Sequence, residues 1–244
     1  MNECGCGLMW SSVGRKIIMA LTGLSLFLFV VAHLIGNLTI LMGAEAFNGY
    51  AHFLMSLMHG KFIYLAEAGL ILFFLLHAWS GIKVWLQKRG AREQGYEVVG
   101  NAGGASQKTL ASRSMILTGP VLLLFVILHV KHFKFGPVYT TMVHGEEVRD
   151  LFRLVVDEFN KPVMVLLYVV TMVLLGTHLK HGVWSAFQSM GWTSKRVLPA
   201  LTTLSAVTGV ALAAGFIYVP LHVFFFIDPQ TALDAAAQIT SGGH

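Results

Sequence analysis

The 244-residue sequence is 55% hydrophobic and only 12% charged, with a mean hydropathy of +0.68. Soluble globular domains carry about twice this share of charged residues, so the composition excludes that class and indicates a protein embedded in membrane lipid. The formal charge of +5 does not indicate a nucleic-acid partner, because the Lys and Arg residues form short clusters between apolar stretches, as in the loops of membrane proteins.

Five apolar stretches are long enough to cross a bilayer, which needs about 20 residues. They cover residues 16–43, 60–87, 114–136, 162–190 and 197–227. The connections leave no room for a second domain, so residues 1–244 are predicted to form one all-α transmembrane bundle, with a short interfacial helix from Ala46 to Leu57. The first stretch follows Arg15 and Lys16 as a signal peptide would, but its length predicts that it is retained as a helix.

The distribution of Lys and Arg predicts which side of the membrane each connection faces. Eleven of these residues share the side of the N-terminal segment: Arg15, Lys16, Lys83, Lys88, Arg89, Arg92, Lys108, Arg113, Lys180, Lys195 and Arg196. Six lie on the other side: Lys61, Lys131, Lys134, Arg149, Arg153 and Lys161. Because cytoplasmic loops are richer in Lys and Arg, the N-terminus is predicted to be cytoplasmic and the C-terminus outside. The mixed-charge segment 146–158 is then a solvated helix or loop on the outer face.

Cysteine and histidine are the residue types that bear on metal sites. Cys4 and Cys6 have no further cysteine to complete a zinc or iron–sulfur site, and no motif for covalent haem attachment is present, so we expect two reduced thiols. The eleven histidines are more informative. An ionisable side chain inside a bilayer is costly and usually has a function.

Four histidines inside the predicted spans fall into two levels. His33 and His129 stand 17 and 15 residues from the cytoplasmic ends of their spans, so a rise of about 1.5 Å per residue places both toward the outer face. His77 and His178 stand 17 and 16 residues from the outer ends of spans that run the other way, which places both toward the cytoplasmic face. Two such pairs predict the axial ligands of two stacked haem b groups, on the order of 10 Å apart along the membrane normal.

An internal repeat selects among the histidines. The segments Leu21–His33 and Leu117–His129 both read L-T-G-x-x-L-x-L-F-V-x-x-H, which favours His129 over His132 as the counterpart of the first histidine. A lone transmembrane histidine could equally be a packing residue or part of a proton path. Four histidines at matched depths, with repeated surroundings, indicate haem ligation more strongly than packing.

Shorter patterns indicate the surroundings of the cytoplasmic haem. The pattern H-x-x-x-G begins at His77 and at His178, which favours His178 over His181. Thr22 and Thr118 each precede a ligand of the outer haem by eleven residues, about three turns, and so lie roughly 16 Å lower, at the level of the cytoplasmic haem. Small residues at this level would allow the helices to approach the flat ring closely.

Haem propionates need cationic or hydroxyl partners near the cytoplasmic ends of the spans. The candidates are Arg15, Lys16, Ser112, Arg113 and Lys180, among which Arg113 is favoured because it opens its span. Each of them could instead anchor a helix at the membrane interface.

A quinone exchanges protons as well as electrons, so ionisable side chains near the outer edge of the membrane are candidates for its site. Glu67 lies about 10 Å into its span from the outer end, and His52 is expected nearby. A buried glutamate in lipid is rarely without function. The alternatives are that Glu67 is hydrated and that His52 caps the interfacial helix. We expect both residues to take part in proton exchange with the quinone.

Several motifs are specific enough to suggest a family. They are A-H-L-I-G-N around His33, G-A-E-A-F-N-G-Y-A-H-F from Gly43 to Phe53, L-H-A-W-S-G around His77, L-H-V at His129 and T-H-L-K-H-G-V-W-S from Thr177 to Ser185. Through them the sequence resembles, from about Ser11 to Phe226, the single-subunit, five-helix, two-haem cytochrome b anchor of succinate dehydrogenase and fumarate reductase, the complex II enzymes.

The resemblance implies a multi-pass protein of a prokaryotic cytoplasmic membrane that binds two haem b groups and a quinone, expected to be menaquinone. It also implies an iron–sulfur subunit and an FAD flavoprotein with the dicarboxylate site on the cytoplasmic face, so that this chain is the quinone-reactive subunit. The family's haem ligands fall on His33, His77, His129 and His178, in the same pairs. Some fumarate reductases carry a proton-conducting glutamate where this sequence has Gly176, which puts that proton route in doubt.

Two other functions are compatible with the histidines. One is the dihaem cytochrome b of another respiratory enzyme, such as a hydrogenase or formate dehydrogenase, although the helix count and the outward-facing partners of those enzymes fit less well. The other is a transporter or channel with a histidine relay, which would be colourless when purified. The sequence does not distinguish succinate oxidation from fumarate reduction.

Overall fold

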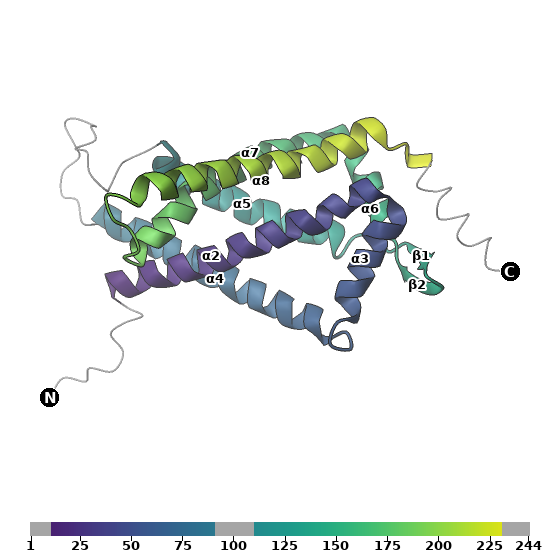
Figure 1. The fold of residues 1–244 in the computed structure, drawn as a ribbon, viewed down its shortest axis with the longest axis horizontal. Helices are drawn as coiled ribbons and strands as arrows, with labels where there is room; N and C mark the ends of the chain where they lie inside the picture. Colours follow the sequence, from purple (N-terminus) through teal and green to yellow (C-terminus); the bar gives the residue numbers. More distant parts are fainter. Residues whose placement is uncertain (1–10, 91–109, 231–244) are drawn as a thin grey trace. The chain divides into compact units, whose positions relative to one another are not determined.

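A computed structural model describes residues 11–90 and 110–230 of the chain. Its elements are, in chain order, α2 (Ser12–Leu38), the 3₁₀ helix η1 (Thr39–Met42), α3 (Ala44–Ser56), α4 (Lys61–Gly90), α5 (Leu110–Phe133), β1 (Thr140–Val143), β2 (Glu146–Arg149), α6 (Leu151–Phe159), α7 (Pro162–Ser189) and α8 (Leu198–Phe226) (Figure 1). Cys4 and Cys6 lie outside the described residues. The short helix predicted from Ala46 to Leu57 is present as α3, and its place at the membrane interface stays a prediction.

Within the described residues, five helices are long and apolar enough to cross a membrane. Their spans are Val13–Met42, Lys61–Gln87, Met115–Phe133, Pro162–Ser189 and Leu198–Phe226. These spans coincide with the five stretches predicted from hydropathy, so the predicted helical membrane bundle is confirmed. The orientation of the termini and the single-domain organisation stay predictions.

The described residues group into two compact units. The first consists of residues 11–29, 68–90, 110–120 and 176–210, and the second of residues 30–67, 121–175 and 211–230. Each of the five long helices contributes one segment to each unit. The four predicted haem ligands divide evenly: His77 and His178 lie in the first unit, and His33 and His129 lie in the second.

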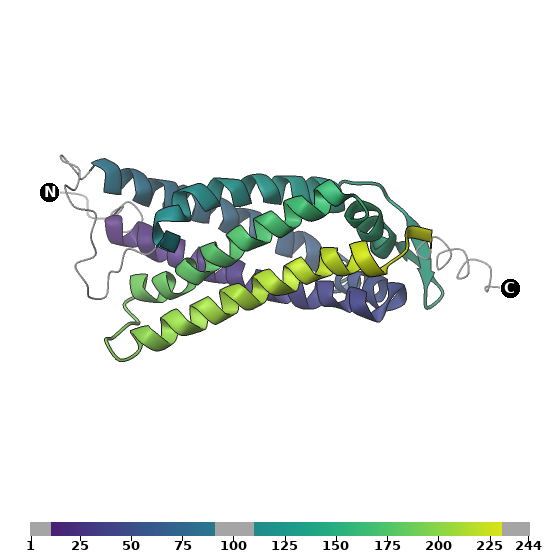
Figure 2. The same ribbon diagram turned by 90° about the horizontal axis from the view of Figure 1, so that it is seen from above.

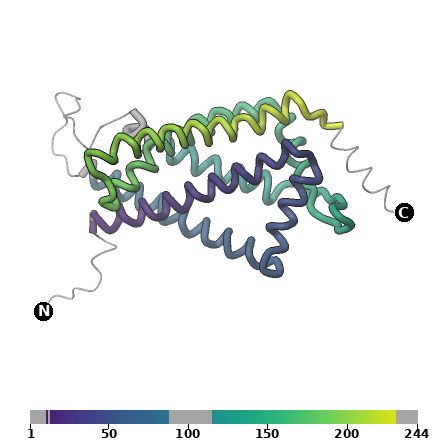
Figure 3. Tube along the Cα trace, in the orientation of Figure 1, coloured from purple at the N-terminus to yellow at the C-terminus, as the bar shows by residue number. Residues whose placement is uncertain are grey.

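In the first unit, the end of α7 packs closely on the start of α8, which follows it after a short turn (Figure 3). The Ser205 hydroxyl lies within hydrogen-bond distance of the backbone oxygens of Leu179 (3.2 Å) and Lys180 (2.7 Å). A Cβ atom added to Gly209 would lie 2.8 Å from the backbone oxygen of Gly176. Glycine at position 209 therefore allows the two helix backbones to approach this closely.

In the second unit, α3 runs from η1 toward the start of α4, and the hairpin β1–β2 and helix α6 pack against it (Figures 1 and 2). A buried polar network joins α3 to α6. Asn48 Nδ2 donates to Asp150 Oδ1 at 2.8 Å, and Asn48 Oδ1 accepts from the backbone N–H of Phe152 at 2.9 Å. Asp150 Oδ1 also caps α6 by accepting from the backbone N–H of Arg153. Because Asn48 and Asp150 are only 1% and 4% exposed, these mutual hydrogen bonds offset the cost of burying them.

The mixed-charge segment 146–158, predicted to be an outer helix or loop, forms the second strand of a β-hairpin and most of helix α6. β1 and β2 are antiparallel, and Thr140 pairs with Arg149 and Val143 with Glu146. The two turn residues, His144 and Gly145, have φ angles of 51° and 84°. A type I′ turn, whose twist matches that of the two flanking strands, requires a positive φ at both central residues. The hydropathy pattern carried no sign of this turn.

Candidate metal centres

The second unit brings His33 of α2 and His129 of α5 together. Their ring centroids are 5.7 Å apart and the ring planes are perpendicular. Phe216 of α8 lies 6.0 Å from the His33 ring, and Phe125 stacks on the His129 ring at 5.7 Å. Both imidazoles thus face each other in aromatic, half-buried surroundings.

The first unit brings His77 of α4 and His178 of α7 together in a similar way. Their ring centroids are 6.3 Å apart, with an interplanar angle of 66°. The alternative histidines belong to neither pair. His181 instead packs edge-on against Trp184 at 5.2 Å, and the Nδ1 atom of His132 is buried without a hydrogen-bond partner among the described residues.

The two pairs fit a haem better than a bare metal ion. Two imidazoles on opposite sides of one iron, at metal–nitrogen distances of about 2 Å, have ring centres roughly 6 Å apart, which is the spacing of both pairs. A bare ion needs three or four protein ligands, and no group of three or more His, Cys, Asp or Glu side chains suited to a metal occurs in residues 11–90 and 110–230. A porphyrin supplies the remaining four nitrogens itself.

Hydrogen bonds at Nδ1 leave the opposite ring nitrogen of three histidines available for iron. His77 Nδ1 lies 3.2 Å from the backbone oxygen of Met19, and His178 Nδ1 lies 3.1 Å from the Thr118 hydroxyl. His129 Nδ1 lies 2.9 Å from the Tyr168 hydroxyl. Histidine ligands of metals almost always make such a second contact, because it fixes the tautomer and the ring orientation.

The His77 ring lies directly against the backbone of α2. A Cβ atom added to Gly23 would stand 2.9 Å from His77 Cε1 and 3.2 Å from His77 Nδ1, closer than non-bonded atoms tolerate. In the internal repeat the counterpart of Gly23 is Gly119, where an added Cβ atom would meet nothing within 4 Å. The two halves of the repeat therefore differ in how tightly a histidine packs on them.

The other residues predicted around the cytoplasmic haem lie in the first unit. Thr22 is buried and its hydroxyl donates to its own helix, to the backbone oxygen of Ile18 at 2.6 Å. Lys180 is exposed, whereas the Nε atom of Arg15 is buried and has no hydrogen-bond partner among the described residues. Of Ser112 and Arg113 only the helical backbone is described, and their side chains lie outside the described part.

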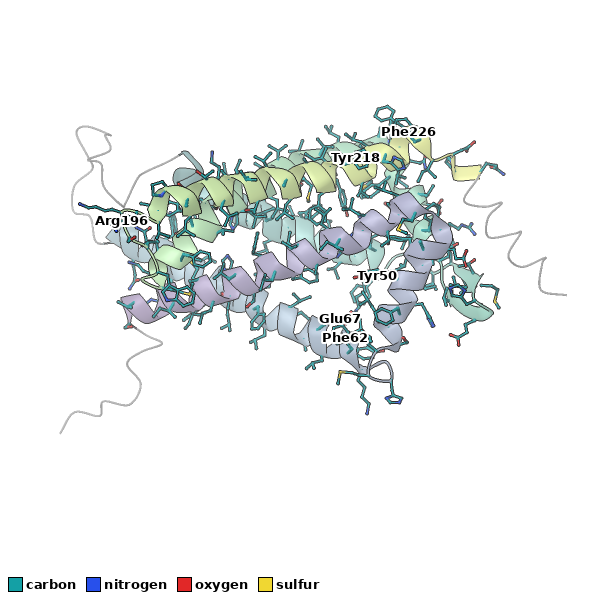
Figure 4. The ribbon with its side chains drawn as sticks, viewed as in Figure 1. Tyr50, Phe62, Glu67, Arg196, Tyr218 and Phe226 are labelled. Atoms are coloured by element: carbon teal, nitrogen blue, oxygen red, sulfur yellow. The ribbon has the colours of Figure 1, made fainter. Side chains whose placement is uncertain are left out.

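The two predicted quinone residues lie in the second unit and each has an ionic partner. Glu67 of α4 pairs with Lys134, which directly follows α5, and both side chains are partly exposed. His52 Nε2 on α3 lies 2.9 Å from Glu146 Oε2 on β2. In Figure 4, Glu67 is drawn in the same part of this unit as Phe62 and Tyr50. No contact between Glu67 and His52 is found in the described structure.

Comparison with known proteins finds a curated relative that aligns with most of the chain. The chain is 28% identical over 199 residues to the succinate dehydrogenase cytochrome b558 subunit of Bacillus subtilis strain 168, and the alignment covers 81% of this chain and 88% of the relative. No family model and no solved structure matches the chain. The predicted resemblance to the cytochrome b anchor of complex II is confirmed. Together with the five apolar helices, this likeness supports the predicted localisation of the chain as a multi-pass protein of a prokaryotic cytoplasmic membrane.

Three residues at the candidate centres were not predicted from the sequence. They are Met19 and Gly23, which contact His77, and Tyr168, which contacts His129. A signal for Tyr168 was available: it stands six residues into α7 from Pro162, about 9 Å by helix rise, while His129 stands four residues from the end of α5, about 6 Å. A polar aromatic residue at the depth of a predicted ligand is a candidate hydrogen-bond partner for that ligand.

Proposed function

We propose that this chain is the dihaem cytochrome b anchor of a succinate dehydrogenase or fumarate reductase, passing electrons between a membrane quinone and a cytoplasmic iron–sulfur subunit. The observation that carries the proposal is the occurrence of two imidazole pairs. In each pair the ring centres are about as far apart as those of two imidazoles bound to opposite sides of one iron. A histidine relay for protons does not require this spacing. The alignment with a succinate dehydrogenase subunit over most of both chains supports complex II over other respiratory cytochromes b.

His33 and His129 would hold one haem b, and His77 and His178 the other. Each haem supplies a one-electron carrier whose potential depends on its axial ligands and on their hydrogen bonds. The chain's own residues hold the ligands in place: Met19 and Thr118 contact the first-unit histidines through Nδ1, and Tyr168 contacts His129 in the same way. Among the predicted propionate partners whose side chains are described, Arg15 is the best candidate, because its Nε is buried and has no hydrogen-bond partner among the described residues.

The partner subunits follow from the kind of enzyme that the relative belongs to. A succinate dehydrogenase cytochrome b subunit works with an iron–sulfur subunit and a flavoprotein that carries FAD and the dicarboxylate site. We place both on the face that holds the N-terminus, because eleven of the seventeen Lys and Arg residues fall on this side. Fusion of a reporter enzyme to each connection would test this orientation, and a reporter active outside at residues 88–113 would reverse it.

The quinone, which we take to be menaquinone, would react near the His33/His129 haem. Glu67 offers a carboxylate for proton exchange, and its ion pair with Lys134 would hold the carboxylate in position. The aromatic residues Tyr50 and Phe62 lie in the same unit as Glu67 and suit a flat quinone ring. His52, paired with Glu146, would relay protons toward the outer surface.

Replacing Glu67 with glutamine should slow quinol oxidation about 100-fold and leave the haem content unchanged, because the variant loses a general base and no haem ligand. The measurement is the rate at which a menaquinol analogue reduces the haems of the purified complex. Glu45→Gln is the matched control, since Glu45 is an exposed carboxylate on α3 in the same unit. Equal rates for both variants and the wild type would remove Glu67 from the proton path.

The test of the proposed function is the haem content of the purified chain. We expect two haems per polypeptide by pyridine haemochrome assay, with a reduced-minus-oxidised spectrum typical of low-spin cytochrome b. A chain that is produced with ample haem supply and purifies without colour would exclude the proposal and favour the histidine-relay transporter.

A further inference from the structure

Tyr168 is a buried polar residue at the His33/His129 centre, and its contact with His129 has a further consequence for the haem proposed there. It lies on α7, is only 6% exposed, and places its hydroxyl 2.9 Å from His129 Nδ1. The rings of Phe125 and Phe159 pack edge-on against it, each with its centroid 4.9 Å away. Phe133 adds a third edge-on contact at 6.2 Å. These packed rings fix the direction in which the phenol points.

The direction of the hydrogen bond follows from the coordination. If His129 binds iron through Nε2, its proton must reside on Nδ1, so Nδ1–H donates and the Tyr168 oxygen accepts. Without this acceptor the N–H would be buried among aromatic rings with no partner of its own, which is unfavourable in apolar surroundings. The phenol therefore stabilises the tautomer and ring orientation that present Nε2 to the haem.

The centres differ in the acceptor that each histidine contacts. His77 contacts a backbone carbonyl oxygen, His178 the hydroxyl of Thr118, and His129 the phenol of Tyr168. A ligand whose N–H is held by a better acceptor donates more electron density to iron and favours the ferric state. Different acceptors at the two centres thus provide a way to give the two haems different reduction potentials.

We propose that Tyr168 is a positioning residue that holds His129 as an Nδ1–H imidazole and thereby sets the reduction potential of the His33/His129 haem independently of the other haem. The inference rests on the proposed dihaem function. To the proposed function it adds a specific residue, a direction of hydrogen bonding and an effect confined to one centre.

The experiment is a redox titration of the haems in the complete complex carrying Tyr168→Phe, which removes one oxygen and keeps the packed ring. We expect two haems to be retained. The midpoint potential of one haem should rise by an amount equal to a threefold to tenfold change in its ferric-to-ferrous ratio, at most about 60 mV, while the other stays at its wild-type value. The low-spin electron paramagnetic resonance signal of the same haem should also change, because ligand orientation determines it.

Two further variants assign the effect. Thr118→Val removes the side-chain acceptor of His178 and should move the potential of the other haem. Tyr218→Phe is the matched control, because Tyr218 lies in the same unit but packs at 5.6 Å on His222, which is not a proposed ligand. It should leave both potentials unchanged.

The possible outcomes separate the inference from the proposed function. Loss of one haem from Tyr168→Phe, with a residual spectrum like that of His33→Leu, would support the positioning role in a stronger form. Two retained haems with wild-type potentials, or equal shifts of both, would overturn the role of Tyr168 and leave the dihaem function intact. A wild-type chain without haem would instead remove the function on which the inference rests.

Discussion

Replacing His77 with leucine is expected to leave one haem per chain where the wild type holds two. The variant keeps His178 as a lone imidazole, and a haem with one axial ligand and an apolar group opposite it is bound far more weakly. His33→Leu should also leave one haem per chain, but the remaining haem is then the one held by His77 and His178. The two variants are therefore expected to differ in the position of the remaining absorption band and in midpoint potential, which a redox titration followed by optical spectroscopy would measure.

His222→Leu is the appropriate control for these variants. His222 lies on α8, stacked between Tyr218 and Phe226 at 5.6 and 5.5 Å, and belongs to neither imidazole pair. It should keep both haems. If His77→Leu retained two haems with an unchanged spectrum, His77 would not be a ligand. If His77→Leu and His33→Leu gave identical residual spectra, the pairing itself would be wrong.

Gly23→Ala should weaken the binding of the haem held by His77 and His178 and leave the binding of the other haem unchanged. The added methyl group would stand 2.9 Å from His77 Cε1, so the ring must move away from α2 and lose its contact with the Met19 oxygen. Displacing a ligand from its supporting contact typically lowers metal affinity about 10-fold to 100-fold. The measurement is the rate at which each haem transfers to excess apomyoglobin, with one of the two phases expected to accelerate.

Gly119→Ala provides a control at the equivalent position of the internal repeat. Both substitutions favour the helix by about 1 kcal/mol, since alanine has the higher helix propensity. They differ in the room available, because the methyl group at position 119 would meet no other atom of the chain within 4 Å. Equal haem retention in the two variants would show that the approach of His77 to α2 has no bearing on haem binding.

Much of the arrangement was accessible from the sequence because the relevant signals are local or periodic. The length of an apolar stretch decides whether a helix spans the membrane, and this gave all five spans. The rise per residue converts a position in a span into a depth, and depth alone paired His33 with His129 and His77 with His178. The internal repeat then separated His129 from the nearby His132.

The contacts around the histidines could not be predicted in the same way. Depth says how far along a helix a residue stands, but the rotation of each helix decides what its side chain faces, and rotation depends on packing against neighbours. The bond from Tyr168 to His129 spans 39 positions and depends on the relative rotation of α5 and α7. The ion pair of Glu67 with Lys134 depends on α4 and the end of α5 in the same way.

The three acceptors also differ in how natural mutation can alter them. A hydroxyl at position 118 or 168 disappears with a single codon change. The oxygen of Met19 that contacts His77 belongs to the main chain. It is therefore kept when mutation changes the side chain at position 19. Single substitutions can therefore remove the hydrogen-bond acceptors of His178 and His129 during evolution. The acceptor of His77 remains as long as the helix remains.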